Sequence, residues 1–590
     1  MCGIGGTVGR RPDPALLERM AETMVKRGPD GRGVWTDERA GLAATRLAII
    51  DLHERSNQPL HLGPLHLAFN GEIYNYRELK EELAGLGHRF ETEGDAEVLL
   101  HSWAEWGEGA LERFNGMFAF AMWDADEGAL TLACDPFGEK PLYFTRVGTG
   151  LVFASEVKAL DVQPRADEAA LARYVARGLM PVPPACFFAG VERLPAAHLL
   201  RWTESGAELR QYWRPEPVEV PAAYDDAVDE LRGLMLDSIR LRLRSDVPVG
   251  TSLSGGIDSS CVVMLSAELA GDHRRHAFTA RFPGFERDEW RFAHEVAERA
   301  GVVEHHAIEP TAEEAVTDLE QLVRDHEEPV GSLSVYAQWR VMAAAKEAGV
   351  TVLLDGQGGD ELFGGYPIAS GYAVRSQGLA ATMREAAAGP GRAATIARSL
   401  AADFLPGPAR RAYFRWSASP YAAASPFELD GRPEFRGLDP LRRELLRESF
   451  ETSLPELLRY ADRSSMAHSR EVRLPFLDRR IAELAFSLPP EFLYRDGTSK
   501  RIVRDAGRGL VPDAVLARQD KVGYEPPQRT WLEQPAFREL VAELLVDGRG
   551  LYRPQQIQSD LKRGSWRDHV GLWRALNAEL WLRSLVPAPA

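Results

Sequence analysis

The sequence predicts an α/β chain of more than one domain, with a doubly wound parallel sheet in its second half. The chain has 590 residues, which is more than one hydrophobic core usually organises. Between residues 247 and 308, apolar strand-like segments alternate with helix-like segments, an order typical of parallel strands covered by helices. The first half carries many short strand-like segments and few helices, so we expect a separate layered domain there.

The composition excludes several classes of protein. The net charge of −17 argues against non-specific nucleic-acid binding. No apolar run reaches the roughly 18 residues that a membrane span needs, and no signal-peptide pattern is apparent. The four cysteines, Cys2, Cys134, Cys186 and Cys261, are too few and too scattered for a disulfide framework or a zinc site. We therefore expect a cytoplasmic protein with no membrane or nucleic-acid partner.

The clearest motif is Ser-Gly-Gly-Ile-Asp-Ser-Ser at residues 254–260. It lies between an apolar strand predicted over 247–253 and an apolar helix that runs to residue 270. The N–H groups of such a turn and the positive end of the helix dipole form an anion site, and Asp258 can hold a divalent cation beside it. The Walker pattern is absent here. The simpler alternative is a serine-capped glycine turn, but the seven-residue match favours the anion site.

A second glycine loop follows an apolar strand predicted over 350–354. It reads Asp-Gly-Gln-Gly-Gly-Asp-Glu at residues 355–361. Both loops, and Ala280 at the end of a strand predicted over 276–282, are expected at the carboxyl edge of the sheet, where nucleotides bind. Asp360 can then pair with Asp258 to hold Mg²⁺. Alone, this loop is as consistent with a turn capped by an aspartate; its place beside the first loop favours the functional interpretation.

The chain begins Met1-Cys2-Gly3. Removal of the initiator Met is plausible before a small residue and would give Cys2 a free α-amino group. Such an amine can act as the general base for its own thiol. From position alone, a cysteine that merely comes second is the better interpretation, so the case depends on the residues that follow.

The elements predicted next are a helix over 14–25, a strand over 45–52 and a strand over 67–69. The last of these is expected to end in an Asn70-Gly71 turn before a helix over 77–86, and Asp95 is expected to cap a further helix.

An α-amino acid amide substrate needs a cation for its carboxylate, anions for its ammonium and donors for an oxyanion. Arg46 can supply the cation, Glu72 and Asp95 the anions, and Asn70 and Gly71 the oxyanion donors. Each alone is more often a cap or a surface ion pair.

Prolines and the loss of periodicity near residue 215 predict a boundary, with domains at 2–215 and 216–590. A helix is predicted over 222–243, and an α-helical insertion over 367–450. Basic residues in 458–466, 473–478 and 500–506 can neutralise a leaving pyrophosphate, although on a helix they are usually a solvated face. Lys521, in a glycine-bordered loop, is the better catalytic candidate, and Lys500 is assigned to the substrate side or to structure.

These motifs resemble a known family. The 254–260 loop is similar to the pyrophosphate loop of the N-type ATP pyrophosphatases, and the Cys2 group resembles class II, N-terminal-nucleophile amidotransferases. Together they resemble the glutamine-hydrolysing asparagine synthetases of the B type over nearly the whole chain. The resemblance implies an αββα Ntn-hydrolase sandwich followed by a doubly wound parallel α/β domain like the adenine-nucleotide α-hydrolases, with a helical insertion.

The resemblance also implies residue roles. The nucleophile is Cys2, the oxyanion donors are Asn70 and Gly71, and Lys521 stabilises negative charge at the second centre. Glutamine is held by Arg46, Leu47, Ala48, Ile49, Ile50, Asn70, Gly71, Glu72 and Asp95. ATP is held by Leu253, Ser254, Gly255, Gly256, Asp258, Ser259, Ala280, Asp355 and Gly356, and Mg²⁺ by Asp258 and Asp360. Glutamine, ATP and a carboxylic acid are the implied substrates, and a homodimer the implied assembly.

The second loop departs from the family pattern, at Asp355 in place of a Ser and at residue 357, and its Asp-Gly-Gln-Gly-Gly-Asp-Glu version resembles the broad group of asparagine-synthetase-like amidotransferases. The best-known bacterial members carry Ser-Gly-Glu-Gly-Ala-Asp-Glu at the second loop, and their Glu contacts the acceptor and the incoming ammonia. Here that residue is Gln357, which is neutral. Aspartate is the first expectation for the acceptor, and a larger acid of a natural-product or polysaccharide pathway the second. Two other hypotheses are an amine-using ligase or cyclase, disfavoured by the intact Cys2 group, and a non-catalytic protein, disfavoured by Asp258, Asp360 and Lys521.

Overall fold

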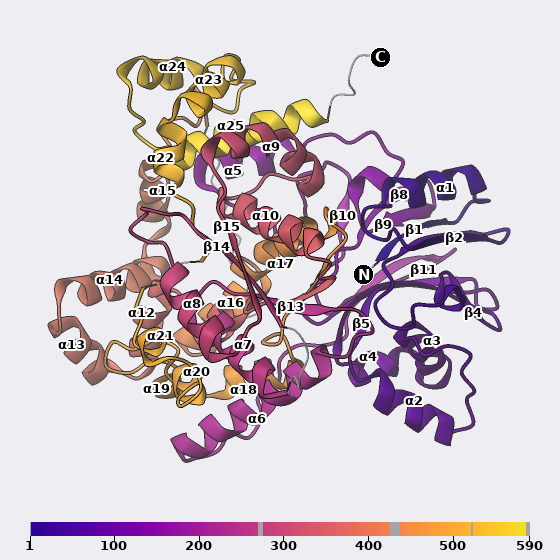
Figure 1. Ribbon diagram of the computed structural model, residues 1–590. Coiled ribbons are helices and arrows are strands. Elements are labelled where there is room, and N and C mark those ends of the chain that lie inside the picture. The colour runs from indigo at the N-terminus through magenta and orange to yellow at the C-terminus, as the bar shows by residue number, and fades with distance from the viewer. Residues whose placement is uncertain (1, 270–274, 425–436, 521–522, 586–590) are drawn as a thin grey trace.

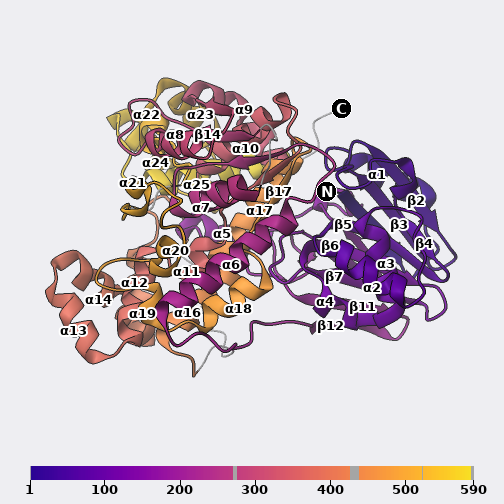
Figure 2. The same cartoon turned by 60° about the horizontal axis from the view of Figure 1, so that its bottom comes forward.

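The protein forms two lobes, an all-antiparallel sandwich and a helix-rich lobe around a parallel sheet (Figure 1). The computed structural model describes residues 2–269, 275–424, 437–520 and 523–585. Turning the molecule by 60° separates the lobes clearly: the sandwich lies at the right and the helices at the left (Figure 2). Within these described ranges, no helix is both long and apolar enough to cross a bilayer.

Two six-stranded antiparallel sheets make the sandwich. The first has the order β10-β8-β9-β1-β3-β2 and the second β12-β11-β7-β6-β5-β4. The strands of the first sheet are β1 (Cys2–Val8), β2 (Gly31–Thr36), β3 (Ala40–Arg46), β8 (Tyr143–Val147), β9 (Gly150–Ala154) and β10 (Glu192–Arg193). Those of the second are β4 (Leu60–Leu62), β5 (Leu65–Ile73), β6 (Gly116–Asp124), β7 (Ala129–Cys134), β11 (His198–Thr203) and β12 (Gly206–Gln211).

Helices cover both outer faces of the sandwich. Helix α1 (Pro14–Thr23) packs on β1 and β3, whereas α3 (Asp95–Trp106) packs on β5 and against α2 (Tyr76–Gly85). Between the sheets, fully buried Ile4, Leu42 and Phe153 of the first meet Trp123 of the second. The layers therefore run α, β, β, α, and the predicted fold class is confirmed. Two further helices of this half are α4 (Ala110–Arg113) and α5 (Glu168–Arg177).

Three sequence expectations in this half are wrong in detail. Arg46 ends strand β3 instead of starting one, and residues 47–52 form a loop. Strand β5 continues through Asn70 and Gly71, so they form no turn, because β6 pairs with both residues. The cap residue of α3 is Gly94, and the Asp95 carboxylate instead accepts a hydrogen bond from Ile73 N at 2.8 Å.

The second lobe is organised by a five-stranded parallel sheet of order β15-β14-β13-β16-β17. Its strands are β13 (Val249–Ser252), β14 (His276–Ala280), β15 (Glu304–Ile308), β16 (Val352–Leu354) and β17 (Glu471–Arg473). Strands β13 and β16 are neighbours in parallel register, so the two glycine loops that follow them meet at one edge. The doubly wound prediction is confirmed.

Helices surround this sheet. Around the strands lie α6 (Tyr224–Arg242), α7 (Ile257–Leu269), α8 (Trp290–Arg299), α9 (Ala312–His326), α10 (Ser334–Glu347), α11 (Gly359–Phe363), α17 (Ser453–Met466), α18 (Arg479–Ser487), α19 (Pro490–Leu493) and α20 (Arg501–Ala506). The insertion contributes α12 (Pro367–Ser376), α13 (Leu379–Ala387), α14 (Pro390–Phe404), α15 (Gly407–Trp416) and α16 (Pro440–Phe450). The carboxyl-terminal part holds α21 (Asp513–Leu516), α22 (Gln528–Glu533), α23 (Pro535–Leu544), α24 (Pro554–Arg563) and α25 (His569–Ser584).

The insertion is helical, as predicted, and α12 to α14 project from one side of the molecule in both views (Figures 1 and 2). Helix α5, which precedes the predicted boundary, packs against α25 near the other end of the chain. The division at 215/216 stays a prediction.

Buried ion pairs join the two lobes. Arg27 donates from both terminal nitrogens to Asp462 on α17, at 2.8 and 2.9 Å, and neither side chain is more than 2% exposed. Glu156 accepts from Arg27 at 3.2 Å and pairs with Arg463 at 2.9 Å. Burial alone would raise the pKa of Asp462, but the Arg27 guanidinium holds it below its usual value. The charges therefore satisfy one another away from water.

We predict that Asp462→Ala strongly destabilises the protein. Removing one partner of a buried pair leaves the other charge uncompensated, which costs about 3–5 kcal/mol. Thermal unfolding of the variant should show a lowered Tm. The control Glu320→Ala removes the exposed pair between Glu320 and Arg324 on α9 and should leave Tm unchanged. Equal Tm values for the two variants would contradict the role given to the junction.

Candidate active centres

The first centre surrounds Cys2, which opens strand β1 and pairs with Arg46 of β3. Its Sγ is 3.8 Å from Gln58 Nε2, its N–H donates to Asn70 Oδ1 at 3.0 Å, and its carbonyl accepts from Arg27 Nε at 3.0 Å. Cys2 is only 6% exposed, and burial raises the pKa of its thiol, an effect that Leu47 N–H and Arg46 partly oppose. A buried thiol of this kind needs a base beside it to react as a thiolate.

Asn70 accepts a hydrogen bond from Cys2 and keeps a spare donor of its own. Its Oδ1 is used by Cys2 N, while its Nδ2 is buried and has no hydrogen-bond partner among the described residues. A buried, unsatisfied N–H donor costs free energy unless a ligand uses it. Gly71 beside it has φ +154°, and a Cβ there would lie 2.1 Å from Met117 O. The structure thus places a spare donor and an obligatory glycine next to the candidate nucleophile.

Arg46 is buried, and its guanidinium is hydrogen-bonded to backbone carbonyls of the loop that follows it. Its terminal nitrogens donate to His53 O at 2.8 Å, to Ile50 O at 3.2 Å and to Asp51 O. The same loop contains Leu47, Ala48 and Ile49, and Ala48 N donates to Asp30 Oδ2 at 2.8 Å. The guanidinium therefore shapes this loop in addition to the substrate role predicted for it, which stays a prediction.

Two buried acids lie beyond Asn70. Burial raises the pKa of Glu72 well above its usual range, and Glu471 and Asp95 add to the effect. Burial likewise raises the pKa of Asp95 to about 6. Arg473 of β17 lies 3.6 Å from Glu72, so the second lobe supplies part of this environment. Two carboxyl groups that resist ionisation are suited to a site that receives a cation.

The second centre is a cavity of about 370 Å³ between the two glycine loops. It is bordered by Ser254, Gly256, Asp258 and Ser259 from the first loop and by Asp355, Gly356, Gln357 and Asp360 from the second. Three residues predicted to hold ATP do not border the cavity: Leu253 and Ala280 are buried, and Gly255 O accepts from Arg518 at 3.0 Å. Their assignment to ATP stays a prediction.

The glycines let the two loops touch. A Cβ on Gly356 would lie 2.6 Å from Ser259 N, and one on Gly359 would lie 2.6 Å from the Asp258 carboxyl carbon. Any other residue would push the loops apart, so glycine is required by the close approach. Helix α7 begins at Ile257 and its amino end opens on the cavity, as the motif predicts for an anion site.

Lys500 joins Asp258 to Asp360. Its Nζ lies 2.5 Å from Asp258 Oδ2 and also contacts Asp360 Oδ1. The residue is 4% exposed and has φ +50°, a strained value for a lysine at the start of α20. One ammonium thus stands between the two carboxylates, which is the position that the sequence assigned to a metal. The other candidate, Lys521, lies outside the described residues.

The carboxylate pair fits a magnesium ion. Oxygen donors are the ligands that Mg²⁺ prefers, and two carboxylates plus substrate phosphates are its usual set. The Lys500 ammonium already bridges the carboxylates of Asp258 and Asp360. The distance between the two carboxylates is therefore one that a metal cation could also bridge if it replaced the ammonium.

Gln357 borders the cavity, and its buried Oε1 has no hydrogen-bond partner among the described residues. Asp355 accepts from Gln357 N at 3.2 Å, and burial raises the pKa of Asp355 to about 6. The neutral acceptor at residue 357 is therefore available to a donor entering the cavity.

Several contributing residues were not identified from the sequence. Arg518 donates to Gly255 O at 3.0 Å and to Glu289 at 2.8 Å, which ties the residue after α21 and Ala517 to the first loop. Gln58 faces Cys2, and no local pattern marks it. Arg463 and Arg473, considered as pyrophosphate ligands, are instead buried at the junction between the lobes. Of the basic residues in 500–506, Lys500 and Arg504 do border the cavity.

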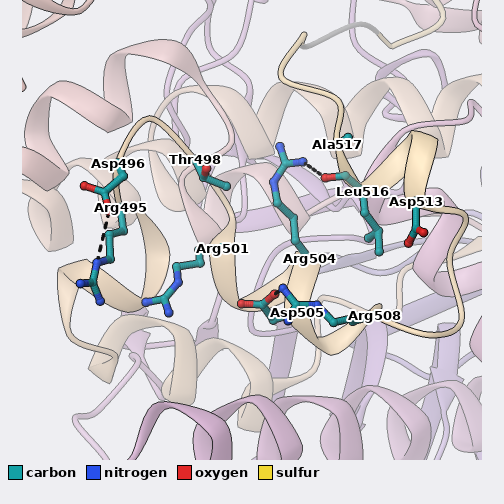
Figure 3. Close-up of a pocket in the computed structure, with 10 residues that line it drawn as sticks. All are labelled: Arg495, Asp496, Thr498, Arg501, Arg504, Asp505, Arg508, Asp513, Leu516 and Ala517. Carbon is teal, nitrogen blue, oxygen red and sulfur yellow. Dashed lines mark hydrogen bonds and ion pairs between the residues drawn. The ribbon is translucent and has the colours of Figure 1, made fainter. Parts of the chain in front are cut away.

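A further cavity of about 610 Å³ is lined by residues of α20 and of the chain on either side of it, between residues 495 and 517 (Figure 3). Four arginines line it, but their charges are engaged nearby. Arg508 pairs with Asp505, Arg495 with Asp496, and Arg504 donates to Leu516 O at 2.6 Å, while Arg501 covers the Tyr224 ring. A ligand in this cavity would have to compete with these partners for the arginines. The cavity between the two glycine loops is therefore the better candidate for a nucleotide site.

Family comparisons agree with this division into two centres. The family described as Glutamine amidotransferase domain matches residues 1–213, and the family described as Asparagine synthase matches residues 230–583. Asparagine synthetase [glutamine-hydrolyzing] 3 of Bacillus subtilis (strain 168) is 32% identical over 88% of this chain and 86% of its own. Its paralogue Asparagine synthetase [glutamine-hydrolyzing] 1 is 32% identical over 93% of this chain and 91% of its own. Amidase chry2 of Gibberella zeae is 27% identical over 97% and 96% of the two chains.

The fold and these matches define the class: a glutamine amidotransferase sandwich fused to an ATP-using, parallel-sheet ligase domain. The chain belongs to the glutamine-hydrolysing asparagine synthetase family, of the B type. It is an enzyme of the asparagine synthetase (glutamine-hydrolysing) type, and the family's reaction is a glutamine-dependent amidation.

We predict that glutamine binding weakens below about pH 6. The predicted role of Asp95 is to receive the glutamine ammonium, which requires the ionised carboxylate; its pKa is raised to about 6, so below that pH binding must displace a proton. The KM for glutamine, measured by glutamate release, should rise up to about tenfold per pH unit below 6. In Asp95→Asn the KM should be higher throughout and lose this step. An unchanged step in the variant would assign the titration to another group.

Proposed function

We propose that the protein converts a carboxylic acid, most simply aspartate, to its amide with nitrogen from glutamine and energy from ATP. The observation that supports this best is the presence of both centres in one chain: an Asn70 donor beside Cys2, and a cavity framed by Asp258 and Asp360. Hydrolysis of glutamine alone would not need the second, and adenylation alone would not need the first.

In the first centre, the Cys2 thiol attacks the glutamine side-chain amide, and its proton passes to the α-amine that loss of Met1 exposes. The amide oxygen becomes an oxyanion, which Asn70 Nδ2 and Gly71 N–H stabilise. The amine returns the proton to the leaving nitrogen, ammonia departs, and water then hydrolyses the thioester to glutamate. Arg46 binds the glutamine carboxylate, Leu47 to Ile50 line the pocket, and Glu72 and Asp95 receive the ammonium.

In the second centre, an acceptor carboxylate oxygen attacks the α-phosphorus of ATP, and pyrophosphate leaves. Asp258 and Asp360 would hold Mg²⁺, which neutralises the phosphate charge when bound. Ser254, Gly256, Ser259 and the α7 amino end position the phosphates, while Lys500 and Lys521 offset negative charge that develops. Ammonia from the first centre then attacks the acyl carbon, and amide and AMP are formed.

The acceptor is aspartate in this proposal, as the names of the two Bacillus relatives suggest. The alternative is another carboxylic acid, favoured by neutral Gln357 at the acceptor side and by the similarity to a protein named an amidase. An amine-using ligase or cyclase is a weaker alternative, because it would not need the Cys2 centre. A homodimer in the cytoplasm completes the proposal.

We predict that Cys2→Ala separates the two half-reactions. Glutamine-dependent amidation should fall by about 10³-fold or more, because the nucleophile is lost. Amidation with added ammonium salt should continue, since the second centre is intact. The control Cys186→Ala alters another buried thiol and should keep both activities. Loss of the ammonia-dependent reaction in folded Cys2→Ala would overturn the two-centre scheme.

The acceptor is tested by AMP release in the presence of glutamine, MgATP and one carboxylic acid at a time. Aspartate should give AMP and asparagine in equal amounts. An inert aspartate beside an active larger acid would replace the first proposal by the alternative. AMP release with no glutamate formed would instead point to the amine-using ligase.

A further inference from the structure

A histidine–glutamate cluster lies away from both centres, at the edge of the parallel sheet. His276 opens β14, and its register partner Glu304 opens the edge strand β15; His306 pairs with Phe278 two residues further along. Successive residues of a strand alternate between faces, so His276, Glu304 and His306 share one face. The cluster is at the amino ends of strands whose carboxyl ends point toward the loop cavity.

Three donor atoms of this cluster converge. His276 Nδ1 lies 3.1 Å from His306 Nε2 and 3.4 Å from Glu304 Oε2, and His306 Nε2 lies 3.5 Å from Glu304 Oε2. In a tetrahedral zinc site with bonds of about 2.0–2.2 Å, neighbouring ligand atoms are about 3.3–3.5 Å apart. The observed triangle therefore has the size of one face of such a site.

The ring orientations are held by stacking. The His276 and His306 rings are parallel within 5° at 5.4 Å between centroids, and Phe278 stacks on His306 at 4.5 Å. The three candidate ligands, His276, Glu304 and His306, are half-buried, whereas Phe278 is fully buried. The donors are thus presented on rigid strands instead of on mobile surface side chains.

The cluster is distinct from the histidines on the other face of the same sheet. His305 points away from it, accepts or donates at 2.8 Å with Thr279 Oγ1, and stacks on Trp290 and His294 of helix α8. In the part of the chain that the structure describes, no other group of three His, Cys, Asp or Glu residues offers donor atoms this close together. A histidine of this separate group, such as His294, can therefore serve as a control for the cluster.

We propose that His276, Glu304 and His306 bind a divalent transition-metal ion of the zinc type, with water as the fourth ligand. Two imidazoles and one carboxylate are a ligand set that Zn²⁺ accepts, and imidazole nitrogens disfavour Mg²⁺. Neutral imidazoles bind through one nitrogen while the other keeps its proton, so no net proton loss is required. The ion would clamp the edge strand β15 to β14 and thereby stabilise the lobe that carries the nucleotide loops.

The test is a zinc titration of the full-length protein. Protein stripped with a chelator is titrated with ZnCl₂ in excess MgCl₂ against a colorimetric zinc indicator. Wild type should take up one equivalent per chain, and its Tm should rise with zinc, because the ion binds only the folded state. His276→Ala/His306→Ala should bind this equivalent at least about tenfold more weakly, since even outer-sphere changes cost that much.

Glu304→Gln keeps the side-chain shape and tests the site without a large cavity; it should also weaken binding and reduce the zinc-dependent rise in Tm. His294→Ala, on the opposite face, should bind as wild type does. Absence of a zinc equivalent in wild type, or equal binding by the double variant, would overturn the proposal. Because the site is remote from both centres, the variants should retain glutamine-dependent AMP release, so the outcome is independent of the proposed function.

Discussion

The bidentate pair between Arg27 and Asp462 is the interaction on which the arrangement of the two centres depends. Arg27 also donates to the Cys2 carbonyl, so the strand that carries the candidate nucleophile is held by a guanidinium fixed to helix α17 of the other lobe. At the amino end of α17, Ser453 donates to Glu361, which borders the cavity between the two glycine loops. One helix therefore contacts the surroundings of both centres, and a buried charge pair makes separation of the lobes costly.

The two centres differ in the charges that their buried groups present. Around Cys2, burial raises the pKa of both Glu72 and Asp95, and the buried Asn70 Nδ2 has no hydrogen-bond partner among the described residues. In the cavity between the two glycine loops, two carboxylates share the Lys500 ammonium, and the amino end of α7 opens on the same space. These features support the proposal that the first site receives a zwitterionic amino acid and the second a polyphosphate with its counter-ion.

The sequence predicted correctly those elements whose conformation depends on residues next to one another in the chain. The strand–glycine–helix units at 254–260 and 355–361 were found because a tight turn at a helix start needs glycine whatever surrounds it. The strand around Arg46 and the supposed Asn70-Gly71 turn were misplaced because their limits are set by pairing with β2 and β6, which lie elsewhere in the chain. Lys500 was underestimated because its left-handed backbone and its contact with two aspartates have no signature in neighbouring residues.

By itself, the sequence determined the fold class, the two chemical motifs and the family, because these depend on short-range periodicity and on residue types at fixed spacing. Only the tertiary structure decided which charges meet. It brought Arg27 to Asp462, 435 positions apart, Arg473 to Glu72, and the imidazoles of two neighbouring strands to one glutamate. The reason is physical: long-range ion pairs and shared cavities arise from packing of separate elements, and no local pattern in the chain records their partners.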